Sequence, residues 1–519
     1  MKYGRFWSWS RSSFLALTLL VGVVLTGRGA FAEESNDGFA LVESHYAVLI
    51  ANHKRIGRCI QMFFKKGEGD SALWKTEEEM TLALKRVNKV IEEHTKKTVI
   101  EDASGIPQEF RFTMNFQDGE AGTTLTGKRE GNVFVLSTAG REQKIPVDTE
   151  ALGPAALERL TKEKLPLKEG AKLELKTFSA ESPQTVGKMT STVMRRENKT
   201  LLDGKVESLW LVEQTESMLP GEIFKCWMND AYDSLVVSMP FPGIGQTDLY
   251  EVPKSEMAQP LEPIEVFAAS FIYPTGKMAD DRQSQLAIYH LKLPPGKNIQ
   301  LWNGETQKVT LKGDNEADVE ITTETWDVGR AESSLPLTVP DELKDDLAPN
   351  TEIESDNPKI IALAKEAVGT EKNPVLAARK IEGFVRRYIR NKNLDSTFAT
   401  ALEAAESRSG DCTEHAVLVA ALCRASGIPA RVVVGLVHIP APPGAEKKLP
   451  NGLFGFHMWA EAWIGPNQWM PLDAALGSFS VSHIAISKSS LAGPSPLIDL
   501  STGVIQMMDG LKIDVAEMK

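Results

Sequence analysis

Short stretches in which apolar and polar residues alternate dominate the first half of the chain. Alternation of this kind gives a strand one buried side and one side that faces water. Residues 33–262 therefore predict an antiparallel β-rich domain whose turns contain glycine. Two interruptions with a helical or ambiguous pattern break the alternation, at residues 155–162 and at residues 77–97. The clearest strand patterns are residues 45–50, 110–116 and 132–136.

Proline-bearing segments divide the remainder of the chain. A proline pair at 260 and 263 marks a boundary, after which residues 263–330 predict a small β unit. Residues 331–350 are rich in Ser, Pro and Asp, as is typical of an exposed linker. Residues 351–519 combine helix and strand patterns, so the chain as a whole is predicted to be α+β. At 519 residues the chain exceeds one ordinary hydrophobic core, in keeping with several domains.

Three helix starts can be placed in the last third of the chain. Asn357 and Asn373 each precede a proline, and an asparagine cap followed by proline in the first turn begins a helix well. A third helix is predicted from Cys412 to residue 426. Asp411 would cap it, with Glu414 returning the hydrogen bond of a capping box. Cys412 would then lie in the first turn, where backbone N–H groups and the helix dipole lower a thiol pKa.

Strand patterns follow this helix. Residues 431–438 predict a central strand, and alternation from His457 places Trp459 on the same face as the histidine. The chain turns at Gly465 and returns to Asp473. A hairpin loop with an odd number of residues would put Asp473 on the face of His457, whereas an even loop without a bulge would put it on the opposite face.

Four separated blocks of sequence resemble the catalytic core of the transglutaminase-like superfamily, relatives of papain-type thiol enzymes. The blocks are residues 410–416, 420–431, 457–461 and 469–473, and the resemblance covers about a third of the chain, roughly residues 350–519. It implies that 351–519 is a transglutaminase-like catalytic domain. It also implies a triad of Cys412 as nucleophile, His457 as general base and acid, and Asp473 as the group that orients the imidazole.

The family also uses a side chain upstream of the cysteine to stabilise the oxyanion. Asn391 and Asn393 are the candidates for that role here. Calcium sites belong to the animal enzymes of the family, and this sequence has no acidic loop that requires calcium.

Two functions from different classes are compatible with these patterns. The resemblance implies a thiol enzyme that acts on an amide or peptide bond of a protein or peptide substrate. The outcome would be protease- or amidase-type hydrolysis, or transglutaminase-type acyl transfer through a thioester. The alternative is a binding or assembly protein of the cell envelope, in which the β domains hold a partner and the triad is dispensable.

The N-terminus predicts export. Lys2, Arg5 and Arg11 precede an apolar run at 14–26, and small residues suit cleavage near Ala32, so residues 1–32 are interpreted as a signal peptide. An uncleaved membrane anchor is the alternative. With a cleaved signal peptide the mature chain would be periplasmic or extracellular. No later run is long and apolar enough to cross a bilayer. The net charge of −12 excludes nucleic acid as an expected partner.

Cysteines and histidines outside the triad suggest structural roles. Cys59 and Cys226 could pair in an oxidising compartment or be separate core thiols. Cys412 and Cys423 cannot pair if both lie on one helix, because eleven residues at 1.5 Å each separate them by roughly 16 Å. No cofactor or metal is expected, since the following histidines have no second ligand at metal spacing: His45, His53, His94 and His290.

Overall fold

The computed structural model describes residues 37–519 apart from 87–88, 117–122, 139, 220, 242–243, 266–270, 324–325, 327–333, 393–398, 442–448, 467, 494–499, 501–502, 505–506 and 508–509. The predicted signal peptide and the candidate Asn393 lie outside the described residues. The described chain forms two compact units, which meet in sequence between residues 265 and 271.

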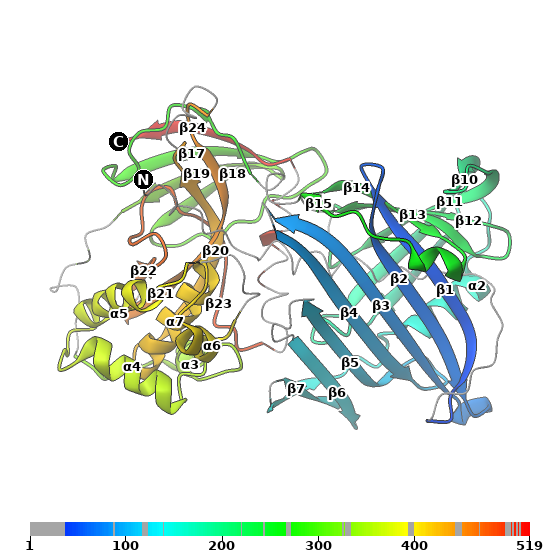
Figure 1. Cartoon of the computed structure of the whole chain (residues 1–519), viewed down its shortest axis with the longest axis horizontal. Coiled ribbons are helices and arrows are strands. Elements are labelled where there is room, and N and C mark those ends of the chain that lie inside the picture. The colour runs from blue at the N-terminus through cyan, green and yellow to red at the C-terminus, as the bar shows by residue number, and fades with distance from the viewer. Residues whose placement is uncertain are drawn as a thin grey trace. The chain divides into compact units, whose positions relative to one another are not determined.

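The first unit is built on one large sheet, which twists and curves along its length (Figure 1). Its main path has the order β8-β7-β6-β5-β4-β3-β2-β1-β14-β13-β12-β11-β10-β9, and every neighbouring pair on it is antiparallel. The short strand β15 pairs with β3 in parallel. The strands are β1 (Ala40–Ala51), β2 (Lys54–Lys66), β3 (Leu73–Arg86), β4 (Lys89–Glu101), β5 (Pro107–Phe116), β6 (Thr123–Glu130), β7 (Val133–Thr138), β8 (Arg141–Pro146), β9 (Lys172–Thr177), β10 (Gly187–Thr200), β11 (Val206–Glu216), β12 (Phe224–Met228), β13 (Ser234–Phe241), β14 (Gly245–Glu251) and β15 (Ile264–Glu265).

The antiparallel β-rich prediction for this region is confirmed, and the helix expected at 155–162 is α2 (Pro154–Lys164). The helical or ambiguous interpretation of residues 77–97 is wrong, because they lie in β3 and β4. Charged residues give this segment its helix-like pattern, but in the structure they form ion pairs between the two strands. Lys96 Nζ lies 2.6 Å from Glu79, and Lys97 Nζ lies 3.0 Å from Glu78.

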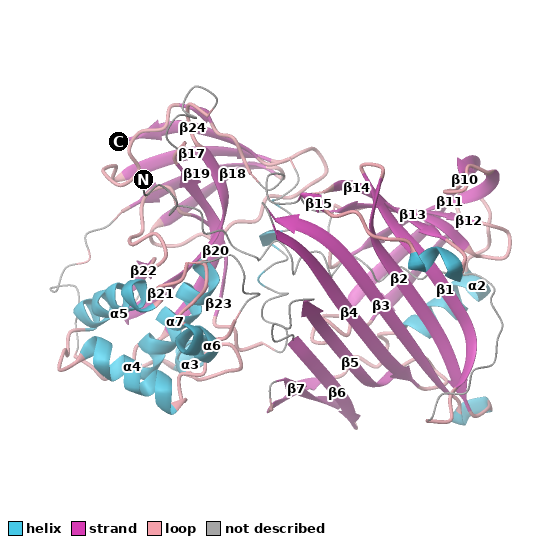
Figure 2. Ribbon diagram, viewed as in Figure 1, coloured by secondary structure: helices cyan, strands magenta, loops and turns pink. Residues whose placement is uncertain are grey.

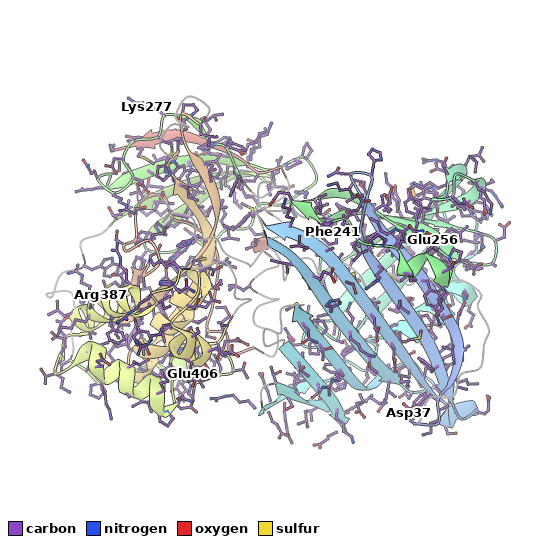
Figure 3. The ribbon with its side chains drawn as sticks, in the orientation of Figure 1. Asp37, Phe241, Glu256, Lys277, Arg387 and Glu406 are labelled. Atoms are coloured by element: carbon purple, nitrogen blue, oxygen red, sulfur yellow. The ribbon has the colours of Figure 1, made fainter. Side chains whose placement is uncertain are left out.

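The second unit contains a four-stranded antiparallel sheet of order β22-β21-β20-β23, with helix α7 packed on β20 and β21 (Figure 2). Exposed charged side chains such as Arg387 on α5 and Glu406 on α6 face water (Figure 3). The elements are α3 (Lys344–Leu347), α4 (Pro358–Val368), α5 (Pro374–Tyr388), α6 (Ala401–Ser407), α7 (Cys412–Ala425), β20 (Ala430–Ile439), β21 (Leu453–Gly465), β22 (Gln468–Leu472) and β23 (Ile484–Ser489).

A five-stranded sheet of order β16-β24-β17-β19-β18 completes this unit. Its strands are β16 (Thr275–Gly276), β17 (Leu286–Lys292), β18 (Gln307–Gly313), β19 (Glu316–Thr322) and β24 (Lys512–Met518). Most come from the range 263–330, where the sequence predicts a small β unit, but β24 comes from the end of the chain. The β unit and the region of the predicted catalytic domain therefore share strands within one compact unit.

The helix starts lie where the sequence predicts them. The side chain of Asn357 accepts a hydrogen bond from the backbone N–H of Lys359, and that of Asn373 accepts from Val375 and Leu376. Each helix begins with its proline. Across the part of the chain that the structure describes, we found no helix with the length and apolar character that crossing a bilayer requires.

Gly435 allows the central strand of the smaller sheet to approach its neighbours closely. It pairs with His457 on β21, and a Cβ at this position would lie 2.0 Å from the backbone oxygen of Ile484 and 2.8 Å from the ring of Trp459. A side chain here would force β23 or Trp459 to move.

We therefore expect Gly435→Ala to lower the free energy of unfolding by about 1–3 kcal/mol, the usual cost of overpacking a core. Urea unfolding followed by tryptophan fluorescence measures it. Gly313→Ala is the matched control, because a Cβ there meets nothing within 4 Å. Equal midpoints for the two variants would contradict the proposed close approach.

Candidate active site

A complete capping box starts the helix that carries Cys412. The Asp411 carboxylate accepts from the backbone N–H of Thr413 at 2.9 Å, and Glu414 accepts from the backbone N–H of Asp411 at 2.7 Å. Glu414 also accepts from the backbone N–H of Ala399 at 3.0 Å, which ties the segment before α6 to this helix start. Cys412 is the first residue of α7, as the sequence predicts.

The Cys412 thiol is fully buried where α7 packs on β21. Burial and the nearby Asp411 charge raise its pKa well above the ordinary value, while a hydrogen bond from the backbone N–H of Met458 acts in the opposite direction. The lower pKa expected from the helix start is therefore not what the surroundings produce. Burial therefore disfavours the thiolate, and a base beside the thiol would be needed to form it.

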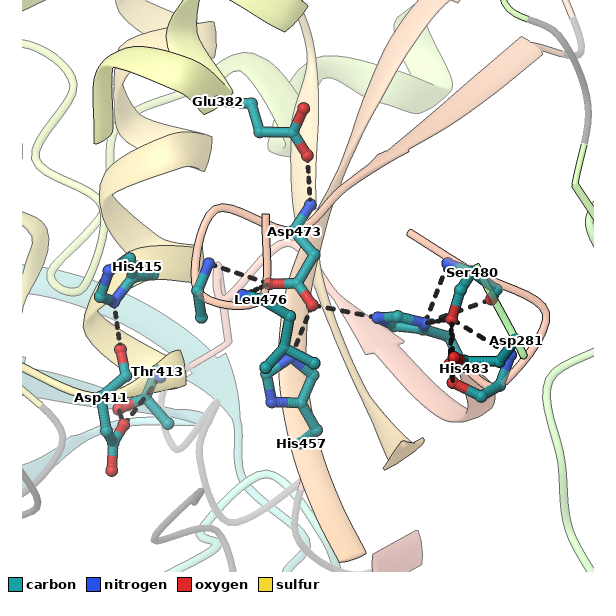
Figure 4. Close-up of polar contacts among 12 residues, drawn as sticks. Asp281, Glu382, Asp411, Thr413, His415, His457, Asp473, Leu476, Ser480 and His483 are labelled. Atoms are coloured by element: carbon teal, nitrogen blue, oxygen red, sulfur yellow. Dashed lines mark hydrogen bonds and ion pairs between the residues drawn. The ribbon is translucent and has the colours of Figure 1, made fainter. Parts of the chain in front are cut away.

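His457 and Asp473 meet on one face of the hairpin formed by β21 and β22. Gly465 pairs with Gln468 across it, which leaves a loop of two residues, and a bulge between Trp463 and Gly465 shifts the register so that Trp463 pairs with Trp469. The side chains of 457 and 473 therefore share a face. His457 Nε2 lies 2.8 Å from Asp473 Oδ2, and both residues are buried (Figure 4).

The Asp473 carboxylate has several donors. Its Oδ1 accepts from the backbone N–H groups of Ala475 and Leu476 at 2.9 and 3.0 Å, and its Oδ2 accepts from two imidazoles. Burial raises its pKa, but the charges and hydrogen bonds of His457 and His483 outweigh that effect and hold the pKa far below the usual range. Asp473 is thus a buried carboxylate that stays ionised because donors surround it.

His483 is the second imidazole on this carboxylate. The sequence pattern did not predict its role. Its Nε2 lies 3.0 Å from Asp473 Oδ2, and its Nδ1 accepts from the backbone N–H of Ser480 at 3.1 Å (Figure 4). The hydroxyl and the backbone oxygen of Ser480 also lie 3.2 Å from Nδ1, while the Asp473 carboxylate on the other side accepts from Nε2–H. No spacing rule links His483 to the triad, since it lies just before β23, a strand that reaches the site only through the sheet.

His457, Asp473 and His483 together resemble a set of metal ligands, since one ligand atom from each lies within 4.8 Å of the others. The hydrogen bonds argue against a metal at this place. Both Nε2 atoms lie at hydrogen-bond distance from the same oxygen of Asp473, 2.8 and 3.0 Å, which suits two imidazole donors on one carboxylate. The cluster is better described as a carboxylate held between two imidazole donors.

Other residues of the domain, the candidate Asn391 among them, have structural surroundings. His415 is buried on α7, with Nδ1 bonded to the backbone oxygen of Asp411, and burial lowers its pKa to about 4. Asn391 is exposed, and its backbone bonds Gly410. Phe454 and Phe456 are core residues. All four cysteines are free thiols, so the possible Cys59–Cys226 disulfide is absent.

Comparison with known proteins places this region in a family. Residues 361–474, which include all three predicted triad positions, match the transglutaminase-like superfamily. The C-terminal region is a transglutaminase-like domain. Members of this superfamily are typically cysteine-based enzymes. No curated protein matches the chain significantly.

Three solved structures are similar to parts of the chain. A candidate cysteine protease from Cytophaga hutchinsonii is 17% identical over 46% of this chain and 89% of its own, with a TM-score of 0.29. A β-barrel-like domain of unknown function from Brucella abortus is 13% identical over 40% of this chain and 94% of its own, with a TM-score of 0.30. The periplasmic domain of TgpA from Pseudomonas aeruginosa, bound to ethylmercury, is 18% identical over 38% of this chain and 74% of its own, with a TM-score of 0.26.

The role of His483 in holding Asp473 can be measured through stability. We expect His483→Leu to lower the free energy of unfolding by about 1–3 kcal/mol, because it removes a buried donor from an ionised carboxylate. His483→Gln, which keeps an N–H donor, should lose less. Urea unfolding of both variants, with the exposed His53→Leu as control, tests this. Equal stability of His483→Leu and the unaltered protein would show that the bond contributes nothing.

Proposed function

We propose that this protein is an exported thiol enzyme that acts on amide or peptide bonds. In this proposal Cys412 is the nucleophile, His457 the general base and then acid, and Asp473 the group that orients the imidazole. The observation that carries the proposal is the 2.8 Å bond from His457 Nε2 to Asp473, which leaves Nδ1 as the ring nitrogen free to exchange a proton with the thiol. Export is supported by the signal-like pattern of residues 1–32.

The steps follow from these assignments. The Cys412 proton moves to His457 Nδ1 as sulfur attacks the carbonyl carbon. The C–N bond then breaks, the imidazolium protonates the leaving amine, and a thioester remains on Cys412. Water, or a second amine, attacks the thioester while His457 removes its proton, and the thiol leaves with a proton from the imidazolium. Asp473 stays ionised throughout and stabilises the imidazolium.

The hydrogen bond from the Met458 backbone N–H to the thiol supports the pairing of Cys412 with His457, since Met458 is the next residue on β21. The same N–H is a candidate donor to negative charge that develops during attack, together with the N–H groups of the first turn of α7. Neither donor depends on Asn391, which is exposed.

Burial of the thiol favours a second candidate function. Cys412 is wholly buried and His457 nearly so, as would suit a protein that keeps the domain as a scaffold and uses its β sheets to bind an envelope partner. Full biological function of a Cys412→Ala variant would support that alternative over the enzyme.

Alkylation kinetics test the thiol assignment. We expect iodoacetamide to modify Cys412 at least ~10-fold faster in the unaltered protein than in His457→Ala, because the imidazole accepts the thiol proton. Peptide mass spectrometry measures the rate at each cysteine. Cys423 is the matched control, since it is buried on the same helix, and burial together with the charge of Glu382 raises its pKa. Identical rates in both proteins would remove the base role from His457.

Isotope labelling distinguishes the two outcomes of the thioester. We expect hydrolysis, because it requires only that water enter, so a cleaved protein or peptide substrate should carry ¹⁸O in its new carboxyl group when the reaction runs in H₂¹⁸O. A fluorescent primary amine in the same mixture reports acyl transfer. Cys412→Ala should give neither product. Amine incorporation without ¹⁸O would show that the enzyme is a transamidase.

A further inference from the structure

A second group of ionisable side chains lies inside the first compact unit, far in sequence from the triad. Glu43 and His45 stand two residues apart on β1 and so share a face. Glu251, at the end of β14, pairs in register with Ala47, which puts it on that face too. Helix α2 adds Glu158. The sequence suggests that His45 is isolated, because two of its three carboxylate neighbours, Glu158 and Glu251, lie more than a hundred residues away in the sequence.

His45 has no exposed surface, yet neither of its ring nitrogens has a hydrogen-bond partner among the described residues. Carboxylate oxygens lie just beyond hydrogen-bond range on both sides: Glu43 Oε1 is 3.6 Å from Nε2, and Glu251 Oε1 is 3.5 Å from Nδ1. The other oxygen of Glu251 is also buried without a partner. An unpartnered buried imidazole between carboxylates is costly unless something else satisfies it.

The group holds more acidic than basic side chains. The carboxyl groups of Glu43, Glu158 and Glu251 surround one ammonium, that of Lys162, and burial raises the pKa of Glu158 to about 7. Lys162 Nζ lies 2.6 Å from Glu158 and 3.5 Å from Glu43 Oε2. Lys162 therefore contacts Oε2 of Glu43, whereas His45 faces Oε1 of the same carboxylate.

We propose that Glu43, His45 and Glu158 bind a divalent transition-metal ion of the Zn²⁺ or Mn²⁺ class. One ligand atom from each residue lies within 4.8 Å of the other two. Bonds of about 2.0–2.2 Å to one ion would bring these atoms roughly 3–4 Å apart, so the side chains need move only slightly. One imidazole with two carboxylates suits such ions better than Ca²⁺, which takes oxygen ligands.

Glu251 completes the arrangement from the opposite side of the imidazole. Histidines that bind a metal through one nitrogen donate the other N–H to a carboxylate or carbonyl, which fixes the tautomer. His45 would bind the ion through Nε2, on the side of Glu43, and donate Nδ1–H to Glu251. The ion would join β1 to α2, so its expected role is to fasten the helix to the sheet.

Metal binding to the full-length chain tests this proposal. The protein is freed of metal with EDTA, and its stoichiometry and affinity for ZnCl₂, MnCl₂ and CaCl₂ are measured by calorimetry and elemental analysis. We expect one Zn²⁺ or Mn²⁺ per chain, no comparable Ca²⁺ binding, and a higher midpoint of thermal unfolding with metal present. Absence of stoichiometric binding by every metal would overturn the proposal.

Variants locate the ion. His45→Gln and Glu158→Gln should abolish stoichiometric binding, and Glu251→Gln should weaken it by about 10 to 100-fold, the usual cost of losing an outer partner. His94→Gln is the control, because His94 is a partly exposed histidine of the same sheet. Unchanged binding in His45→Gln would place the ion elsewhere and refute the assignment.

Lys162→Met separates metal binding from a loss of folding. Removing the ammonium leaves the carboxylates with no cation but the metal, so the variant should bind Zn²⁺ more tightly than the unaltered protein and depend on it more for stability. If Lys162 alone neutralises the group, the variant will be destabilised and will bind no ion, which would overturn the proposal.

Discussion

The site depends on keeping one carboxylate ionised in the interior. Removing a charge from water costs several kcal/mol unless donors replace the lost solvent. Asp473 meets that requirement with two backbone N–H groups on one oxygen and two imidazole N–H groups on the other. Its own backbone N–H donates to Glu382 on α5 at 2.7 Å, so the helical layer fixes its position as well. The orientation of His457 follows from this arrangement.

The five-stranded sheet contributes to the same site from outside the region that matches the family. Gln307 on β18 exchanges hydrogen bonds with the backbone of Ala485, at 2.8 and 2.7 Å, and Tyr289 on β17 donates to the backbone oxygen of Val481. These contacts fix the backbone two residues before and two residues after His483. Asp281 accepts from the Ser480 hydroxyl at 2.9 Å, which steadies the residue whose N–H donates to His483 Nδ1. The β unit therefore braces the segment that carries the second imidazole.

Features that depend on neighbours in sequence could be predicted from the sequence. The capping box at Asp411 and Glu414 is a local pattern of this kind. The hairpin left two arrangements open, and the bulge on β21 is what puts His457 and Asp473 on one face. Features set by distant partners could not. The sequence of residues 77–97 is ambiguous because the charges that stabilise β3 and β4 form ion pairs between the strands. The surroundings of His45 and His483 come from segments that only folding brings together. The prediction of a lowered pKa for the Cys412 thiol was wrong for a related reason, since complete burial outweighs the local effect of a helix start.

One ionised carboxylate, Asp473, holds both imidazoles by their Nε2–H groups, and in the proposed mechanism this leaves Nδ1 of His457 for the thiol. Nuclear magnetic resonance of the protein with ¹⁵N-labelled histidine rings tests it directly. We expect His457 and His483 both to appear as Nε2–H tautomers, with ring protons shifted downfield and protected from exchange. Asp473→Asn should change the signals of both rings. A His457 ring protonated on Nδ1 alone, or an Asp473→Asn spectrum in which both rings are unchanged, would contradict it.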